Sequence, residues 1–187
     1  MLAMSRLSYF PFVLLIFGLL PLSAGATDIL PHGLRFHIST RAPEQLAAFY
    51  AGRGFPESMI KEIEQTCFMT VGIRNERNDV VWLQLDKWRF LDEQGKEIHR
   101  ITRQDWNARW DKIYAPLGSR STFGWTQLPE SRDLQPGEPV GGNIAVIPPK
   151  GKFVLEATLP IGYDNSVPPL HVRVENLECP EAGKVVK

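Results

Sequence analysis

Four histidines and two methionines are the side chains of this sequence best suited to bind a soft metal ion, since imidazole and thioether groups favour copper-type ions. They are His32, His37, His99, His171, Met59 and Met69. No two of the histidines are two or four positions apart, so no strand or helical turn presents a ready pair of ligands. His37 and His171 are expected on outward faces of strands and could meet only if those strands are neighbours. Copper-type metal binding is therefore an alternative function, and we expect no resident cofactor.

The sequence contains no recognisable catalytic motif. There is no Gly-x-Ser-x-Gly nucleophile turn, no His-Glu-x-x-His zinc motif, and no glycine loop followed by Lys-Ser or Lys-Thr that would bind phosphates. The acidic residues are scattered without a recognisable acid–base pair. Cys67 could act as a nucleophile beside a histidine, but a disulfide would consume the same thiol. We therefore expect a protein that is not an enzyme.

The two cysteines, Cys67 and Cys179, are expected to form a disulfide. Such a bridge would fasten the last predicted strand to the strand that begins at residue 67. It would close a loop of about 110 residues, for which the chain-entropy model allows at most ~4–5 kcal/mol of stabilisation. The alternative is two buried thiols. Cysteines this far apart in the sequence do not form a redox motif of the Cys-x-x-Cys kind.

A helix predicted over residues 102–114 carries the most distinctive group of side chains in the chain. Thr102 can cap its first turn, with Asp105 three residues later. Helical spacing of two tryptophans is typical of a face packed into the core. The same spacing is also compatible with a contact surface for a protein or a sugar. The candidate contact surface comprises Arg103, Trp106, Arg109 and Trp110.

The N-terminal segment sets the compartment in which this chemistry takes place. Residues 1–26 have a positive start at Arg6, an almost wholly apolar stretch over residues 10–20, and a small-residue site at 24–26, as in a secretory signal peptide. The alternative is an uncleaved membrane anchor, but the stretch is shorter than the ~20 residues that a spanning helix needs. We expect export to the periplasm, cleavage after Ala26 and no membrane span afterwards.

Composition excludes some partners. The chain of 187 residues holds 21 basic and 21 acidic residues with no basic block. We therefore expect no nucleic-acid partner. The 15 prolines indicate many short elements rather than long helices.

Alternating apolar residues predict that the chain is organised around a β-hairpin over residues 67–90. Cys67, Met69, Val71 and Ile73 share one face of the first strand, and Val81, Leu83 and Leu85 share one face of the second. The phase changes after Leu85, which indicates a bulge near residues 86–87.

The remaining elements are short. Strands are predicted from residue 34 to 38, 96 to 101, 121 to 127, 144 to 146, 153 to 159 and 170 to 174. Short helices are expected to begin at Pro43 and at Pro56-Glu57. Residues 27–33 are expected to be a leader. Because no regular crossover helices separate the strands, the pattern predicts an antiparallel β-sandwich rather than a doubly wound α/β fold.

Several segments resemble exported bacterial domains with an immunoglobulin-like β-sandwich. The resemblance covers residues 67–179, and its segments are residues 71–75, 90–96 and 134–138, followed by Val140, Gly142, Ile144 and the strand with Phe153 and Leu155. It implies a mainly β fold with short helical insertions and implies no active site. We divide the chain into the signal peptide 1–26, a strand and helical segment 27–66 packed on the sandwich, the sandwich 67–180, which forms one domain with 27–66, and a tail 181–187.

The leading expectation is an exported, non-catalytic binding or assembly module that acts through protein–protein contact. Its expected partner is another periplasmic or envelope protein. A carbohydrate-binding module that uses tryptophan is a further alternative, beside metal binding.

Overall fold

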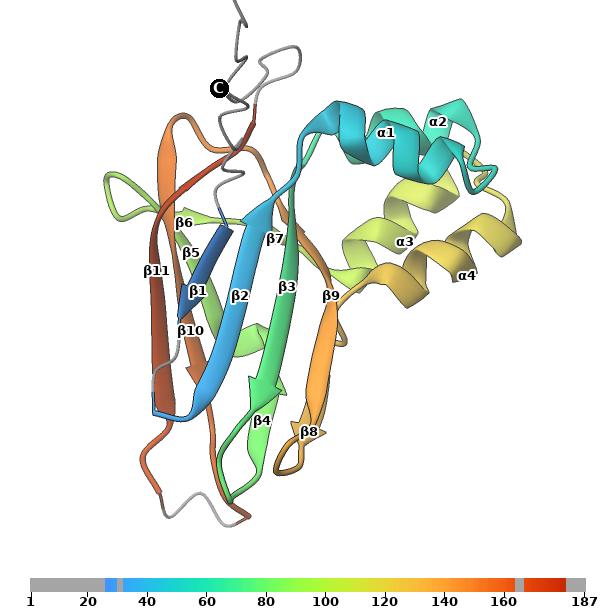
Figure 1. Cartoon of the computed structure of the whole chain (residues 1–187). Helices are drawn as coiled ribbons and strands as arrows, with labels where there is room; N and C mark the ends of the chain where they lie inside the picture. The colour runs from blue at the N-terminus through green and yellow to red at the C-terminus, as the bar shows by residue number, and fades with distance from the viewer. Residues whose placement is uncertain (1–25, 30–31, 164–166, 181–187) are drawn as a thin grey trace, which may run out of the picture.

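The computed structural model describes residues 26–29, 32–163 and 167–180. Two antiparallel sheets face each other in its lower part (Figure 1). One sheet has the order β1-β2-β3-β9-β7, formed by Ala26–Ile29, Leu34–Thr40, Cys67–Asn75, Pro139–Val146 and Arg100–Ile101. The other has the order β11-β10-β5-β6, formed by Leu170–Glu178, Lys152–Leu159, Trp88–Asp92 and Glu97–Ile98. A small third sheet pairs β4 (Val81–Gln84) with β8 (Ser131–Leu134).

Alternation of buried and exposed residues explains how these strands pack. Along β10, Phe153, Leu155, Ala157 and Leu159 are buried, whereas the residues between them are partly exposed. The inward residues of both large sheets form one apolar core, in which the ring of Phe36 on β2 lies 5.6 Å from that of Trp88 on β5. The predicted mainly β, antiparallel architecture is confirmed.

The predicted β-hairpin over residues 67–90 is wrong, although both of its strands are present. β3 pairs with β2 and β9, while β4 pairs with β8, so the two strands belong to different sheets. The buried side chain of Asn75 directs the chain between them, because its amide donates hydrogen bonds to the backbone oxygens of Asp79 (2.7 Å) and Leu134 (2.8 Å). The expected bulge after Leu85 is a short 3-10 helix, η1 (Leu85–Lys87).

Four helices form a separate layer beside the upper end of the first sheet (Figure 1). They are α1 (Pro43–Ala51), α2 (Glu57–Glu64), α3 (Arg103–Lys112) and α4 (Leu117–Thr126). This helical layer has its own apolar core, to which β3 contributes Phe68 and β9 contributes Ala145. The next residues of the same strands, Met69 and Val146, point into the core between the sheets. The two strands therefore support both cores.

The three predicted helices are confirmed as α1, α2 and α3. At α3 the predicted capping residue is confirmed as well. Thr102 caps it as expected: its hydroxyl accepts from the backbone N–H of Asp105 at 3.1 Å, and the Asp105 carboxylate accepts from the Thr102 N–H at 2.8 Å.

The strand expected at residues 121–127 is wrong, because this segment is the second half of α4. Thr, Phe and Trp favour strands intrinsically, but tertiary packing overrides such preferences. A helix lets Phe123 enter the core against the edges of Trp106 and Trp110 while its neighbours stay partly exposed. The leader expected at residues 27–33 is also wrong in part, since Ala26–Ile29 pairs with β2.

The disulfide between Cys67 and Cys179 is confirmed, with the two Cα atoms 5.4 Å apart. It joins the first residue of β3 to the residue that follows β11, and so links the two sheets. The predicted signal peptide, residues 1–26, lies outside the described residues except for Ala26, which begins β1 and pairs with Ser39. The predicted tail, residues 181–187, lies outside them altogether. Within the described ranges, no helix has the length and apolar character needed to cross a bilayer.

Candidate functional site

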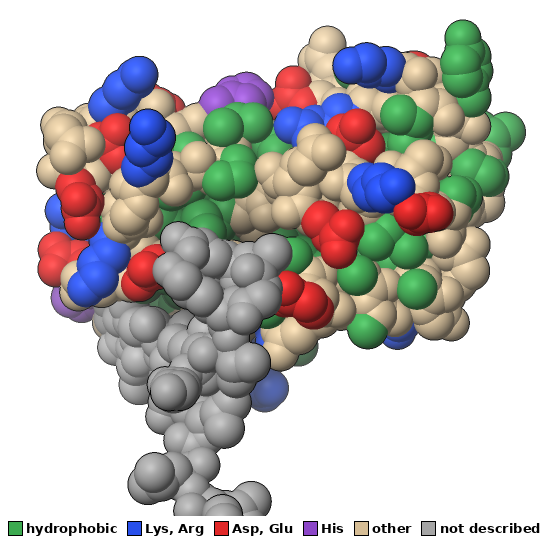
Figure 2. Space-filling view, turned by 90° about the horizontal axis from the view of Figure 1, so that it is seen from above, with side chains coloured by type: hydrophobic (Ala, Val, Ile, Leu, Met, Phe, Trp, Pro, Cys, Tyr) green, Lys and Arg blue, Asp and Glu red, His purple; other side chains and the backbone are tan. Residues whose placement is uncertain are grey.

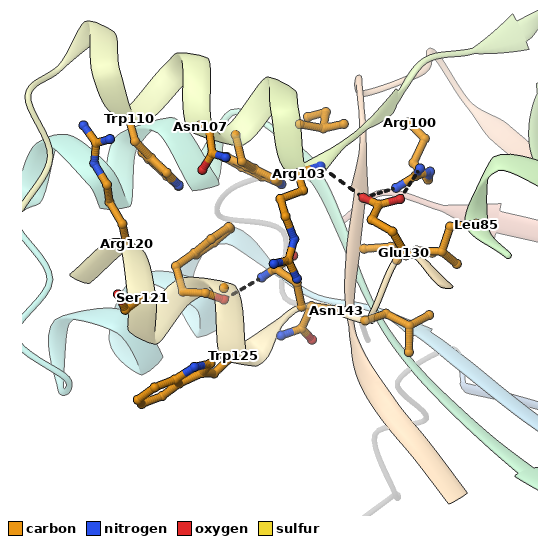
Figure 3. Close-up of a pocket in the computed structure, with 17 residues that line it drawn as sticks. Leu85, Arg100, Arg103, Asn107, Trp110, Arg120, Ser121, Trp125, Glu130 and Asn143 are labelled. Carbon is orange, nitrogen blue, oxygen red and sulfur yellow. Dashed lines mark hydrogen bonds and ion pairs between the residues drawn. The ribbon is translucent and has the colours of Figure 1, made fainter. Parts of the chain in front are cut away.

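A cleft of about 370 Å³ lies between α3, α4 and the adjoining strands β7 and β9 (Figure 3). We call it the α3–α4 cleft. Only four residues, 113–116, connect the two helices, so they run back antiparallel. The first turn of α3 and the last turn of α4 therefore form the same end of the cleft, where the structure places Arg103 and Trp125.

Aromatic rings form the wall of the cleft on the core side. Trp106 and Trp110 stack with their ring centroids 5.0 Å apart and their planes at 16°. The ring of Phe123 meets both of them edge-on, at 4.8 and 5.0 Å. Since the two tryptophans are only 3% and 1% exposed, they hold the helical layer together and do not form an exposed surface themselves.

The four residues of the candidate contact surface separate into two groups. Arg103, Trp106 and Trp110 line the cleft. Arg109 points elsewhere: its guanidinium lies 3.6 Å from the carboxylate of Glu62 on α2 and 5.2 Å from the Trp106 ring. Arg109 therefore joins α3 to α2, and it contributes to the cleft only through its contact with Trp106.

A charged bridge fixes the base of the cleft. Glu130 accepts two hydrogen bonds from the guanidinium of Arg100, at 3.1 and 2.7 Å, and one from the backbone N–H of Arg103 at 3.1 Å (Figure 3). Partial burial alone would raise the pKa of Glu130, but these hydrogen bonds and the charges of both arginines outweigh it and lower the pKa. The carboxylate is therefore ionised near neutral pH, and it holds β7 and the start of α3 beside β8.

Arg103 differs from the other arginines of the cleft, because its guanidinium makes no hydrogen bond or ion pair with any described residue. Arg100 is neutralised by Glu130, and Arg120 is paired with Asp111 at 2.5 Å. One guanidinium of the α3–α4 cleft is therefore left without a direct partner, although its charge still acts on Glu130. Figure 3 shows the Arg103 side chain extending into the space between α3, α4 and β9.

Exposed apolar side chains continue the cleft along the outer face of α4. Trp125 is 85% exposed and Leu117 is 79% exposed, with Ser121 midway between them at helical spacing. Tyr114, in the connection between α3 and α4, is 91% exposed. Seen from above, apolar side chains reach the surface on the side of the helical layer (Figure 2).

Asn143 of β9 connects this cleft with a second cavity of about 650 Å³, which Arg41 lines beneath α1. The Asn143 side chain accepts a hydrogen bond from Thr70 at 2.9 Å and donates one to the backbone oxygen of Thr126 at 2.9 Å. The Thr126 hydroxyl in turn lies 3.0 Å from that of Tyr50. These bonds fix the end of α4 on the sheet, so Asn143 has an evident role in positioning the cleft.

The candidate metal ligands are not brought together. His37 lies on β2 and His171 on β11, strands that belong to different sheets. Met69 is buried between the sheets and Met59 in the helical layer. Among the described residues there is no group of three or more His, Cys, Asp or Glu side chains that could hold a metal ion.

Several residues of the cleft were not anticipated from the sequence. The sequence predicts a strand over residues 121 to 127, which contains Ser121 and Trp125. No pattern in the sequence links the predicted helix 102–114 with Arg100, Glu130 or Asn143. A single exposed tryptophan such as Trp125 does not belong to a repeating pattern of apolar residues, so the sequence does not show that it is exposed. Only the pairing of β7 with β9 and the short turn between the helices bring these residues together.

Comparison with models of known protein families gives no match, and comparison with curated proteins gives none either. Among solved structures, the crystal structure of the yjhA protein from Bacillus subtilis is similar to this chain at a TM-score of 0.39 and 10% sequence identity. The similarity covers 70% of this chain and 76% of that chain. A likeness at this level carries no argument about fold or function, so the site is interpreted from its own residues.

Proposed function

We propose that this protein is an exported, non-catalytic binding module that recognises another envelope or periplasmic protein through the α3–α4 cleft and the outer face of α4. We further propose that its two sheets form an immunoglobulin-like sandwich on which the helical layer is the distinguishing insertion. The disulfide between the sheets supports that assignment. Export is supported by the sequence of residues 1–26.

The observation that carries the proposal is the 85% exposure of Trp125, which lines the same cleft as the unpaired guanidinium of Arg103. Tryptophan, tyrosine and arginine are the residues most enriched among those that dominate binding energy at protein interfaces. Trp125, Tyr114 and Leu117 together leave large apolar side chains in water along one helical hairpin. Large apolar side chains exposed together on one part of a surface are typical of an interaction site.

The backbone of Tyr114 adds an independent argument. Its φ angle is +51°, in the left-handed region that favours glycine and costs other residues of order 1 kcal/mol. Tyr114 follows the end of α3, where glycine would be the usual choice. A tyrosine held there against its preference, with 91% of its surface exposed, is consistent with a side chain retained for contact with a partner.

Protein contact is favoured over the carbohydrate alternative by the apolar extension of the surface and by two of the three amide side chains of the cleft, which bond within the protein. Sugar recognition needs several free hydrogen-bonding groups near an aromatic ring. Asn143 already uses its side chain within the protein, and Gln127 donates to Thr126 at 3.0 Å. Apolar Leu117 and Tyr114, rather than further polar groups, extend the surface beyond Trp125.

Site-specific photo-crosslinking tests the proposal. A photoreactive amino acid at Ser121, between Leu117 and Trp125, is expected to capture a discrete partner in envelope extract of the source cells. The same group at Gln94, in the exposed turn between β5 and β6, serves as the control. Adding Trp125→Ala or Tyr114→Gly to the Ser121 protein should remove the crosslinked product while leaving the fold intact. Equal products from Ser121 and Gln94, or a product that survives both substitutions, would contradict the proposed surface.

A further inference from the structure

We propose that the ligand of the α3–α4 cleft is an acidic segment of the partner polypeptide, with a carboxylate against the Arg103 guanidinium and an adjacent apolar side chain on Trp125. The inference rests on the proposed function, because it names the chemistry of the segment that the same cleft would bind. It goes further because it specifies the sign of the ligand's charge and the residue that binds that charge.

The charge balance of the cleft carries the argument. Three arginines and one glutamate line the cavity: Arg100, Arg103, Arg120 and Glu130. Arg100 pairs with Glu130 at 2.7 Å, and Arg120 pairs with Asp111 at 2.5 Å and also donates to the backbone oxygen of Ala115 at 2.9 Å. Neither is available to a ligand without breaking an internal bond. Arg103 alone offers an unused planar donor fork, whose geometry matches the two oxygens of a carboxylate.

The bonds that Glu130 makes explain why the Arg103 guanidinium stays unpaired. Two carboxylates lie at the start of α3, and both are occupied: Glu130 by Arg100 and the backbone N–H of Arg103, and Asp105 by Thr102. Glu130 therefore satisfies the helix terminus and leaves the Arg103 side chain to point into the cleft (Figure 3). A basic ligand would meet this unpaired guanidinium and be repelled, whereas an acidic ligand would complete the pairing.

A second unsatisfied donor belongs to the same wall. The indole N–H of Trp106 is buried and has no hydrogen-bond partner among the described residues, while the Trp106 ring lines the cavity. A buried donor without a partner costs of order 1–3 kcal/mol. An oxygen acceptor that reached this part of the wall would relieve that cost, and both carboxylate and peptide carbonyl groups supply one. The unpaired Arg103 guanidinium and the unsatisfied Trp106 N–H are thus both donors.

The dimensions fit a short extended segment. Each of the two helices has 10 residues, which gives a groove about 15 Å long at 1.5 Å per residue. An extended chain covers that length with about four or five residues at ~3.3 Å each. Trp125 lies at the Arg103 end of the groove, so one apolar residue next to the acidic one would reach its ring.

A random 12-residue peptide library displayed on phage, selected against the full mature protein in its oxidised form, tests the inference. We expect enrichment of Asp or Glu beside an aromatic or aliphatic residue. For a synthetic peptide of the selected sequence, Arg103→Gln should raise Kd about tenfold or more, as expected when a hot-spot residue is lost. The affinity should also fall with added salt, because the contact is between charges.

Matched variants separate the possible outcomes. Arg74→Glu, at an exposed arginine on β3 that also lacks a described ion-pair partner, should leave the affinity unchanged. Selection against Arg103→Glu should favour Lys or Arg in place of the acidic residue. Peptides that require Trp125 but are neutral, and are insensitive to Arg103→Gln, would overturn the acidic ligand and leave the proposed binding surface standing. If no peptide is obtained whose binding Trp125→Ala abolishes, the binding surface itself is refuted together with the acidic ligand.

Discussion

Replacing each of two tryptophans of the same helical hairpin by alanine should have opposite consequences. Trp110 is 1% exposed, stacked on Trp106 and edge-on to Phe123. Truncating a buried tryptophan costs about 3–5 kcal/mol, and the loss of two aromatic contacts places this site toward the upper end, at ~4–5 kcal/mol. Trp125 is 85% exposed, so Trp125→Ala should change the free energy of unfolding by less than ~0.5 kcal/mol.

Thermal unfolding followed by circular dichroism measures the difference. For a protein of this size, 1 kcal/mol corresponds to a change of about 2–4 °C in Tm, so Trp110→Ala should lower Tm by about 10–15 °C. Trp125→Ala should shift it by no more than ~2 °C. Urea unfolding of both variants provides the same comparison at constant temperature.

The pair also separates stability from binding. Trp110→Ala is expected to weaken binding only because it disturbs the helical layer, whereas Trp125→Ala should weaken binding in a protein as stable as the wild type. A Trp110→Ala protein that melts within ~2 °C of the wild type would refute the two-core description. A Trp125→Ala protein as unstable as the Trp110 variant would refute the exposed position of that ring.

Three further predictions concern stability. A Cβ atom at Gly142 would lie 2.4 Å from the backbone N of Leu128, so Gly142→Ala should lower the free energy of unfolding by about 1–3 kcal/mol. The control is Gly118→Ala, whose Cβ would meet nothing within 4 Å and which should not lower it; equal effects of the two substitutions in urea unfolding would contradict the close approach at Gly142. Replacing both cysteines by alanine opens a loop of 112 residues and should cost up to about 5 kcal/mol, and a loss below ~1 kcal/mol in urea unfolding would show that the bridge constrains little. Because the pKa of Glu130 is lowered in the folded protein, its ionised form stabilises the fold above the unfolded-state pKa of about 4.3, and that stabilisation disappears as the pH falls through the lower folded-state pKa. The stability difference between wild type and Glu130→Gln should therefore be constant from pH 7 to about pH 5 and shrink below about pH 4; a difference independent of pH would argue against the bridge to Arg100.

The elements that depend on local signals were predictable from the sequence. Alternation located β10 and β11, and the Thr102–Asp105 capping box located the start of α3. The disulfide was predictable because only two cysteines were present and the second follows the last strand. These features each involve one short segment or one possible pairing.

What the sequence did not reveal depends on distant partners. The alternation along β3 and β4 is real, but nothing local states that β3 pairs with β9, about 70 residues away, rather than with the strand that follows it. At α4 the strand preference of Thr, Phe and Trp was overruled by the burial of one residue, Phe123, against α3. The cleft could not be predicted for the same two reasons, since it forms only where α3, α4 and β9 meet.

The position of β3 has a consequence for the order in which the molecule can assemble. Its neighbour β2 precedes it, but its other neighbour, β9, leaves the ribosome only after α3 and α4 have been synthesised. Until then β3 lacks the strand that pairs with its second edge from Cys67 to Arg74. Cys179 emerges later still, after β11. The disulfide with Cys67 can therefore form only when every strand of both sheets has been synthesised.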